Sequence, residues 1–365
     1  ISGCTDAGGP DLLKTLKKYI KSIIEKIKIM NSRKLYIHTE NWSEEPFSIS
    51  RSYEDNFDVV VVELEQNGVK GWGEGSPTEH YHESVQQTKT LIEDFREVLE
   101  NGISRQDLQQ AMPKGAARNA VDCALWDLEA KLAGKRIWEL PDISKHLEKD
   151  GKSKAESVTT VYTLSLDSPE KMGEAAAKHA NRPYLKIKLT GDGDLERLTA
   201  ISENAPNSRL VVDANEGWTL EHYQLFVPEL KSLRVEMIEQ PFPADKDSIL
   251  KTLDRPLPVC ADESCHDTLD LERLKGLYEF VNIKLDKTGG LTEALHLQSQ
   301  AKNMGFRTMV GCMSSTSLGI APAFLIAQCA EIVDLDAPLY LYEDRASPIK
   351  YKVSEVFPPA EELWG

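Results

Sequence analysis

The sequence lacks any apolar run of 18 or more residues, so it predicts no membrane-spanning helix. Cysteine is sparse: the six at positions 4, 123, 260, 265, 312 and 329 have neither the spacing of a disulfide framework nor the CxxC pairs of a zinc site. We therefore expect reduced thiols and a cytoplasmic protein. Positive charge is also scarce, because 43 Lys and Arg face 59 Asp and Glu, a formal net charge of −16. Such a surface repels phosphate backbones and excludes nucleic acid as a partner.

The composition is that of a globular chain, with 41% hydrophobic and 28% charged residues. A length of 365 residues exceeds what one compact core usually holds. Length alone therefore predicts two domains, or one large barrel with an attachment.

Residues 1–30 form a distinct extension. Leu and Ile recur there at helical spacing from Leu12 to Ile27, with Lys between them, which predicts a short basic amphipathic helix. A membrane-surface or partner-docking segment is one interpretation. We favour the other, a helix packed on the body or an extension that is irrelevant to the chemistry.

Residues 31–152 have the pattern of an α+β domain. Three strand-like segments come first, and the dipeptide Asn67-Gly68 predicts a hairpin turn between the second and third. Segments with helical periodicity follow. The expected strands are 35–37, 59–64 and 69–73, and the expected helices are 82–99, 105–112 and 116–132.

From residue 153 to residue 340 the pattern changes to short apolar runs that alternate with helical segments. Eight candidate strands recur at intervals of roughly 20 to 28 residues, the repeat of a β/α unit in a closed parallel barrel. They are 158–164, 184–189, 210–213, 235–239, 259–262, 280–285, 308–311 and 332–334. The carboxyl ends of barrel strands carry the chemistry in such folds.

Charged residues occupy these strand ends. Lys186 and Lys188 are two positions apart on one strand and should both face the barrel interior. The next three strands end in carboxylates, at Asp213, Glu239 and Asp262. Three oxygen ligands with no His or Cys among them favour Mg²⁺.

A further lysine, Lys284, follows on the next strand, across the barrel from Lys188. A proton next to a carboxylate is very weakly acidic, so its removal needs a metal to stabilise the enediolate and a base at the carbon. Burial and the neighbouring cations, Lys186 and the metal, can lower the pKa of Lys188 toward neutrality. A lysine on each face permits removal of a proton from one side and its return on the other, which is 1,1-proton transfer.

Any one of the six charged residues at these strand ends could instead belong to a solvated strand face. Six of them on five successive strands nevertheless form a specific pattern.

With these residues, the sequence resembles the muconate-lactonizing subgroup of the enolase superfamily from about Leu35 to Leu341. The matching motifs are GWGE at 71–74, ARNAVD at 117–122, LKIK at 185–188, VDAN at 212–215, IEQP at 238–241, ADES at 261–264 and NIK at 282–284. CADESCH at 260–266 and VNIKLDKTGGLTEA at 281–294 are most similar to the bacterial L-Ala-D/L-Glu epimerases.

The resemblance implies a capping α+β domain over a modified (β/α)7β barrel of the TIM type, with residues 341–365 returning towards the cap. It implies Asp213, Glu239 and Asp262 as ligands of one Mg²⁺. It also implies Lys188 and Lys284 as the acid/base pair and Lys186 as the group that stabilises the enolate. The expected reaction is epimerisation at the α-carbon of the C-terminal residue of a dipeptide.

Substrate choice depends on other residues. Asp334 and Asp336 resemble the Asp-x-Asp motif that holds the free ammonium group of a dipeptide. Arg51 resembles the arginine of the capping domain that pairs with a glutamate side chain. Thr163 is a candidate contact to the terminal carboxylate of the substrate. The acidic residues at 53–55 and the variable stretch at 314–317 leave the side-chain preference open.

The same core also fits N-acylamino acid racemase, o-succinylbenzoate synthase and muconate cycloisomerase. Their substrates have no ammonium group, so Asp334 and Asp336 argue against them. A barrel that has lost catalysis and serves only for binding would have lost ligands or bases, and all six core positions are filled here. The sequence leaves open the range of dipeptides, a homo-oligomeric state and the physiological pathway.

Overall fold

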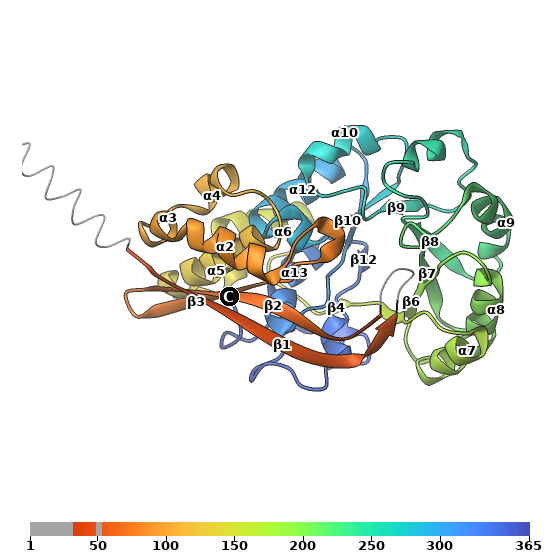
Figure 1. Cartoon of the computed structure of the whole chain (residues 1–365), viewed down its shortest axis with the longest axis horizontal. Coiled ribbons are helices and arrows are strands. Elements are labelled where there is room, and N and C mark those ends of the chain that lie inside the picture. The colour runs from red at the N-terminus through yellow and green to blue at the C-terminus, as the bar shows by residue number, and fades with distance from the viewer. Residues whose placement is uncertain (1–31, 49–52) are drawn as a thin grey trace, which may run out of the picture.

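The computed structural model describes residues 32–48 and 53–365, and they form a small sheet with helices beside a parallel barrel (Figure 1). We call residues 32–48 and 53–149 the cap. Within the described residues, no helix combines the length and the apolar character needed to cross a membrane.

The cap sheet consists of β1 (Lys34–Ser48), β2 (Tyr53–Gln66) and β3 (Val69–Gly75), paired antiparallel in that order. The expected hairpin turn lies between β2 and β3, with Asn67 at φ +55° and Gly68 at φ +80°. Positive φ at both positions is what a two-residue hairpin turn requires, and Asn-Gly tolerates it best. The Asn-Gly prediction is therefore confirmed, although β1 and β2 run further than the expected strands.

The helical segments of the cap follow the sheet in the chain. They are η1 (Glu79–Tyr81), α2 (Val85–Asp94), α3 (Arg96–Glu100), α4 (Arg105–Ala111), α5 (Ala116–Ala133), η2 (Ile137–Glu139) and α6 (Pro141–Lys149). Of these, α5, α2 and α3 contact the sheet. Helix α5 lies directly on β3. A Cβ added at Gly71 would lie 2.4 Å from the Ala124 carbonyl oxygen, and one at Gly73 would lie 2.1 Å from that of Ala120. The alternating glycines of β3 thus permit a backbone-to-backbone approach that no side chain would allow.

The barrel contains eight parallel strands in sequential order. They are β5 (Tyr162–Leu164), β6 (Tyr184–Lys188), β7 (Arg209–Asp213), β8 (Val235–Glu239), β9 (Val259–Ala261), β10 (Phe280–Ile283), β11 (Arg307–Val310) and β12 (Ile332–Val333). The two edges meet through a hydrogen bond of 2.8 Å from the Val161 N–H to the Val333 carbonyl oxygen. The expected α/β barrel architecture is confirmed.

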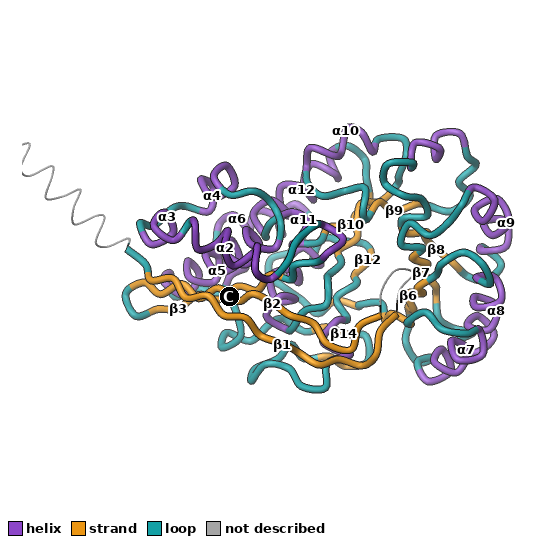
Figure 2. The backbone as a smooth tube through the Cα atoms, in the orientation of Figure 1, coloured by secondary structure: helices purple, strands orange, loops and turns teal. Residues whose placement is uncertain are grey.

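Helical segments connect consecutive strands and lie outside them, as the purple and orange tubes of Figure 2 show. They are α7 (Pro169–Lys178), α8 (Asp194–Asn204), α9 (Leu220–Leu230), η3 (Asp247–Thr252), η4 (Thr268–Asp270), α10 (Leu271–Leu274), α11 (Leu285–Thr288), α12 (Leu291–Asn303) and α13 (Ser317–Ala327). The segment η5 (Ala337–Tyr340) follows β12. Seven connections between eight strands give the (β/α)7β order, with only a 3₁₀ helix between β8 and β9.

The expected strand at 158–164 is in fact divided. Residues Val158–Thr159 form β4, which pairs antiparallel with β14 (Glu355–Val356), itself paired with β13 (Tyr351–Lys352). Only β5 joins the barrel. The Thr160 N–H donates to the Ser354 carbonyl oxygen, so the C-terminal segment draws the first part of the apolar run out of the barrel.

An apolar layer fills the barrel interior below the strand ends. Six buried side chains form it, one from each of six strands or their approaches: Val161, Val211, Met237, Cys260, Phe280 and Met309. Side chains two positions further along a strand face the same way. The next interior layer is therefore Thr163, Asp213, Glu239, Asp262, Asn282 and Gly311. This alternation places the predicted ligands together above an apolar floor.

The cap contacts the barrel through the beginning of α5. The Arg118 guanidinium donates to the carbonyl oxygens of Thr288 (2.7 Å) and Gly289 (3.0 Å), and the Asn119 amide donates to Asp286 (2.8 Å). All three acceptors belong to the segment that follows Lys284. The ARNAVD motif thus holds the loop that carries one of the predicted bases.

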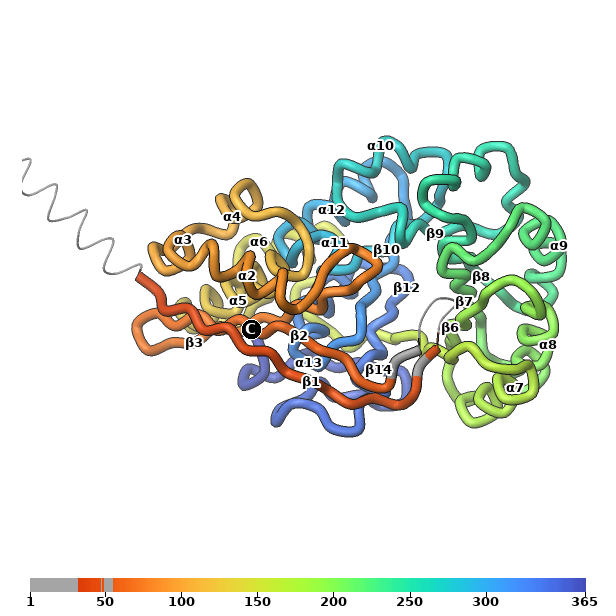
Figure 3. Tube along the Cα trace, in the orientation of Figure 1, coloured from red at the N-terminus to blue at the C-terminus, as the bar shows by residue number. Residues whose placement is uncertain are grey.

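The C-terminal segment packs against the cap, where Figure 3 shows the blue end of the chain. Indole nitrogen Nε1 of Trp364, a fully buried residue, donates to the Cys123 carbonyl oxygen at 3.1 Å. Five cysteines lie in the described part of the chain and all are free thiols: Cys123, Cys260, Cys265, Cys312 and Cys329.

Candidate active site

Lys186 lies at the centre of the polar layer. Its ammonium nitrogen is 2.8 Å from Glu239, 3.1 Å from Asp213 and 2.7 Å from Asp334. The residue is only 1% exposed, so these carboxylates replace its hydration shell. Burial lowers the pKa of Lys186, but Asp334 and the other acids raise it well above its usual value. Lys186 is therefore a fixed positive charge.

Lys188 lies two residues further along, at the end of β6. Its ammonium group donates to Asp213 Oδ2 at 2.8 Å, and Asp213 is fully buried. Burial raises the pKa of Asp213, yet Lys188 and Lys186 together lower it below its usual range. Asp213 is consequently ionised.

Lys284 approaches from β10, with three strands between it and β6. Its ammonium group donates to Asp262 Oδ2 at 2.8 Å. Burial lowers the pKa of Lys284, but the adjacent Asp262 carboxylate raises it above the usual value. Lys284 therefore carries its proton at neutral pH in this arrangement, the form that serves as an acid.

The sequence-based interpretation overlooked three residues that support the predicted ones. Lys287 is 3% exposed, and its ammonium group donates to Asp262 Oδ1 at 2.6 Å, to the Asp262 carbonyl oxygen and to the Asn282 carbonyl oxygen. The Asn282 amide donates to Glu239 at 2.7 Å. Gln240 Oε1 accepts the Asp262 N–H at 2.9 Å. Alternation could have predicted Asn282, two positions before Lys284, whereas Gln240 follows the end of β8 and Lys287 lies in α11.

The predicted metal ligands fit a hard divalent cation. Asp213, Glu239 and Asp262 end adjacent strands, are at most 1% exposed and contribute only oxygen. Burial and the neighbouring Asp213 raise the pKa of Glu239 to about 7, whereas the pKa of Asp262 lies well below its usual range despite burial, because of Lys284 and Lys287. Three buried acids this close together need positive charge between them.

The two aspartates after β12 lie at the same end of the barrel. Asp334 accepts from Lys186, and Asp336 Oδ2 accepts from the Thr163 N–H at 2.6 Å and from the Tyr340 hydroxyl at 2.8 Å. Burial and the adjacent Asp334 raise the pKa of Asp336 to about 7. The structure thus places Thr163 beside Asp336, and Tyr340 is a further member of this group that the sequence did not indicate.

Arg51 lies outside the described residues. The end of the strand before it, however, is placed at the barrel: the Ser48 N–H donates to Ser165 Oγ at 2.7 Å, and Leu166 N–H donates to the Ser48 carbonyl oxygen. The hairpin of β1 and β2 therefore extends from the cap to the strand end of β5.

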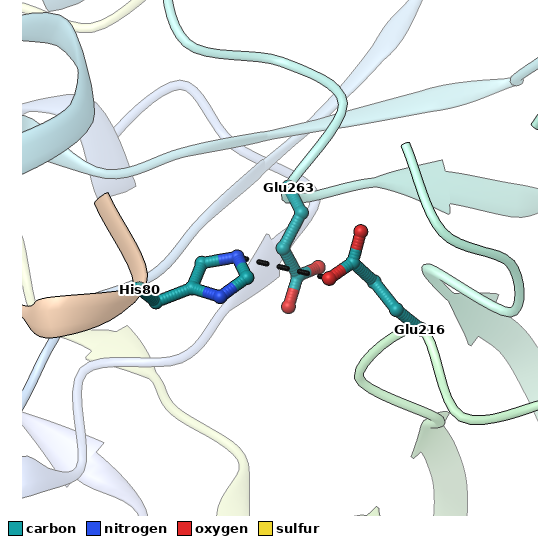
Figure 4. A group of neighbouring side chains, drawn as sticks. All are labelled: His80, Glu216 and Glu263. Carbon is teal, nitrogen blue, oxygen red and sulfur yellow. Dashed lines mark ion pairs between the residues drawn. The ribbon is translucent and has the colours of Figure 1, made fainter. Parts of the chain in front are cut away.

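A second group of ligand-type residues lies where the cap meets the barrel. His80, Glu216 and Glu263 come from three segments, and one potential ligand atom of each lies within 4.8 Å of the others (Figure 4). Glu263 directly follows Asp262 but belongs to this other group. Its Oε1 accepts from the Asn215 amide at 3.4 Å.

Two models of one protein family together match most of the chain. Residues 32–141 match the model of the mandelate racemase/muconate lactonizing enzyme N-terminal domain, and residues 171–355 match the enolase C-terminal domain-like model. The L-Ala-D/L-Glu epimerase of Escherichia coli (strain K12) is 41% identical over 327 residues, 89% of this chain and 99% of that protein. The chain belongs to the enolase superfamily.

Within this superfamily, other relatives differ in their substrates. An N-acetyl-D-glutamate racemase of Pseudoalteromonas sp is 42% identical over 313 residues, 84% of this chain and 95% of that protein. The L-Ala-D/L-Glu epimerase and the N-acetyl-D-glutamate racemase are thus about equally similar to this chain in sequence.

Two similar solved structures each contain a metal ion and a dipeptide. An enolase family member of Agrobacterium tumefaciens with homology to dipeptide epimerases, with bound sodium and L-Ala-L-Glu, has a TM-score of 0.87 and 44% identity, and the match covers 91% of this chain and all of that one. A dipeptide epimerase of Enterococcus faecalis in complex with Mg and L-Leu-L-Tyr has a TM-score of 0.81 and 27% identity, covering 90% and 97%.

Proposed function

We propose that the chain is a Mg²⁺-dependent isomerase that epimerises dipeptides of the L-Ala-D/L-Glu type at the α-carbon of the C-terminal residue. The observation that carries the proposal is the placement of Lys188 and Lys284. The two ammonium groups reach one carboxylate cluster from β6 and β10, with three strands between them. A substrate carbon held over that cluster has one lysine on each side.

Proton transfer follows from this placement. One lysine removes the α-proton from its side, and the other returns a proton to the opposite side, which inverts the carbon. The reverse reaction exchanges the roles. Lys284 lies 2.8 Å from Asp262 and serves as the acid when Lys188 acts as the base.

Asp213, Glu239 and Asp262 would hold the metal. Mg²⁺ bound there supplies positive charge that stabilises the enediolate formed from the substrate carboxylate. Lys186 adds a fixed positive charge at the same place, because three carboxylates hold it within 2.7–3.1 Å. Lys287 keeps Asp262 in position through its contact with Oδ1, which leaves Oδ2 directed toward Lys284.

Asp334 and Asp336 would hold the ammonium group of the dipeptide. They are buried just after β12, and each offers a carboxylate that can pair with an ammonium group. The 41% identity to an L-Ala-D/L-Glu epimerase and the bound L-Ala-L-Glu of the Agrobacterium relative support a dipeptide with a C-terminal glutamate.

Racemisation of an N-acylamino acid is the second candidate, and the 42% identity to an N-acetyl-D-glutamate racemase favours it. The proton chemistry is the same for both, so only the amino end of the substrate distinguishes them. An N-acetyl group has no charge for Asp336 to bind.

The test is to incubate the full chain with Mg²⁺ in D₂O, first with L-Ala-L-Glu and then with N-acetyl-L-glutamate. We expect deuterium at the glutamate α-carbon of the dipeptide and formation of its epimer, with higher kcat/KM than for the acetylated compound. A clear preference for N-acetyl-L-glutamate would replace the dipeptide proposal with the racemase. Exchange with neither compound would contradict both.

The five free thiols of the described residues support a reducing compartment such as the cytoplasm.

A further inference from the structure

A cavity of about 420 Å³ lies between the cap and the barrel, and His80, Glu216 and Glu263 line it together. Each comes from a different segment: His80 from η1 of the cap, Glu216 from the loop after β7 and Glu263 from the loop after β9. Figure 4 shows the imidazole and the two carboxylates converging from opposite sides. We propose that these three residues form a second cation site, distinct from the catalytic one, that takes a single Zn²⁺-class ion and joins the cap to the barrel.

The donor set distinguishes this site from the catalytic one. Asp213, Glu239 and Asp262 offer oxygen alone, which suits Mg²⁺, whereas an imidazole nitrogen with carboxylates suits Zn²⁺. Zinc accepts both His nitrogen and Glu oxygen ligands, and zinc sites with three protein ligands leave a fourth position open to water. The adjoining cavity provides room for that water and a path for the ion.

The distances are close to those of a bound ion. Ligand atoms about 2.0 Å from a tetrahedral zinc lie about 3.3 Å apart. His80 Nε2 lies 3.7 Å from Glu216 Oε2, too long for a hydrogen bond, and all three ligand atoms fall within 4.8 Å. Small side-chain movements therefore suffice to form the site.

Both carboxylates are oriented by hydrogen bonds on one of their oxygens. Glu216 Oε1 accepts the Ala244 N–H at 2.8 Å, and Glu263 Oε1 accepts from the Asn215 amide. Such outer contacts fix the direction of a metal ligand. Glu263 is also only 3% exposed, so its carboxylate has little access to water.

The charge of a divalent ion suits this group of ligands. Such an ion can bind both carboxylates at once, whereas an imidazole carries at most one positive charge even when it is protonated.

The test is a Zn²⁺ titration of the full chain in the presence of saturating Mg²⁺, followed by calorimetry. We expect one Zn²⁺ per chain, with an affinity that stays the same when the Mg²⁺ concentration is raised tenfold. His80→Gln should weaken Zn²⁺ binding by at least tenfold. His82→Asn is the matched control, because His82 is an exposed histidine of the same loop, at φ +59°, and Asn tolerates that conformation.

Glu216→Gln provides a second variant whose side chain can still accept the Ala244 N–H. Its Zn²⁺ affinity should fall by at least tenfold, as for His80→Gln. The second variant therefore still tests the proposal if the first one folds poorly. Absence of Zn²⁺ binding to the wild-type chain, or unchanged affinity in both variants, would overturn the proposal. So would a Zn²⁺ affinity that falls in proportion to added Mg²⁺, because the ion would then occupy the catalytic site. None of these outcomes depends on the substrate of the enzyme.

Discussion

Replacing Asp336 with Asn tests which substrates the site prefers. The carboxylate is 4% exposed, and one of its oxygens accepts from the Thr163 N–H and the Tyr340 hydroxyl. Asn keeps an acceptor for both donors, so the main change is the loss of negative charge. A hydrogen bond to a charged group contributes about 1.5–3 kcal/mol. At about 1.36 kcal/mol per factor of ten, kcat/KM for L-Ala-L-Glu should fall between about tenfold and about 150-fold.

The assay is the initial rate of epimerisation of L-Ala-L-Glu, with N-acetyl-L-glutamate as the uncharged comparison. Because burial and Asp334 raise the pKa of Asp336 to about 7, wild-type kcat/KM for the dipeptide should also rise as the pH increases through 7. The Asn variant should lose that part of the pH dependence. Tyr340→Phe is a matched control that removes one hydrogen bond and keeps the charge. An equal loss with both substrates would show that Asp336 acts on the structure of the site and does not bind an ammonium group.

Three further perturbations probe other parts of the structure. Exhaustive EDTA treatment should abolish turnover and added Mg²⁺ should restore it, and full activity without metal would contradict the assigned ligands. Arg118→Ala leaves four carbonyl oxygens without their buried charged donor and should cost about 3–5 kcal/mol in urea denaturation, whereas a cost under about 1 kcal/mol would refute its role in holding the loop after Lys284. Burial raises the folded-state pKa of Glu83 to about 7, above the value near 4.3 of an unfolded chain, so its stabilising effect is complete below about pH 4.3 and is lost as the pH rises through 7. As the pH rises between those two values, the free energy of unfolding of Glu83→Gln should therefore increase by roughly 1–3 kcal/mol relative to that of wild type, after allowance for partial exposure. The same difference in melting temperature between the two proteins at both pH values would contradict this.

The barrel and its polar layer could be predicted from the sequence because strand alternation is a local rule. Asp213, Glu239 and Asp262 each follow an apolar interior residue by two positions, and the six such pairs of the barrel obey the same spacing. The strand division at Thr160 could not be predicted, since it depends on pairing with Ser354, almost 200 residues away in the chain.

The supporting residues escaped sequence analysis for a similar reason. Lys287 lies on the short α11 turn, and nothing in its spacing shows that this turn directs the side chain back to Asp262. The group of His80, Glu216 and Glu263 joins cap and barrel segments that only the folded chain brings together. Arg51 was singled out by resemblance, and its position lies outside the described residues.

The two-base mechanism is tested most directly by α-hydrogen exchange in D₂O with Lys188→Ala and Lys284→Ala. Mg²⁺ binding should be verified first in both variants. Neither variant should epimerise L-Ala-L-Glu, because each lacks one of the two proton transfers. Each should still exchange the α-hydrogen of one epimer, and the two variants should exchange opposite epimers. Epimerisation at wild-type rates in either variant, or exchange of the same epimer in both, would contradict the placement of one lysine on each face of the α-carbon.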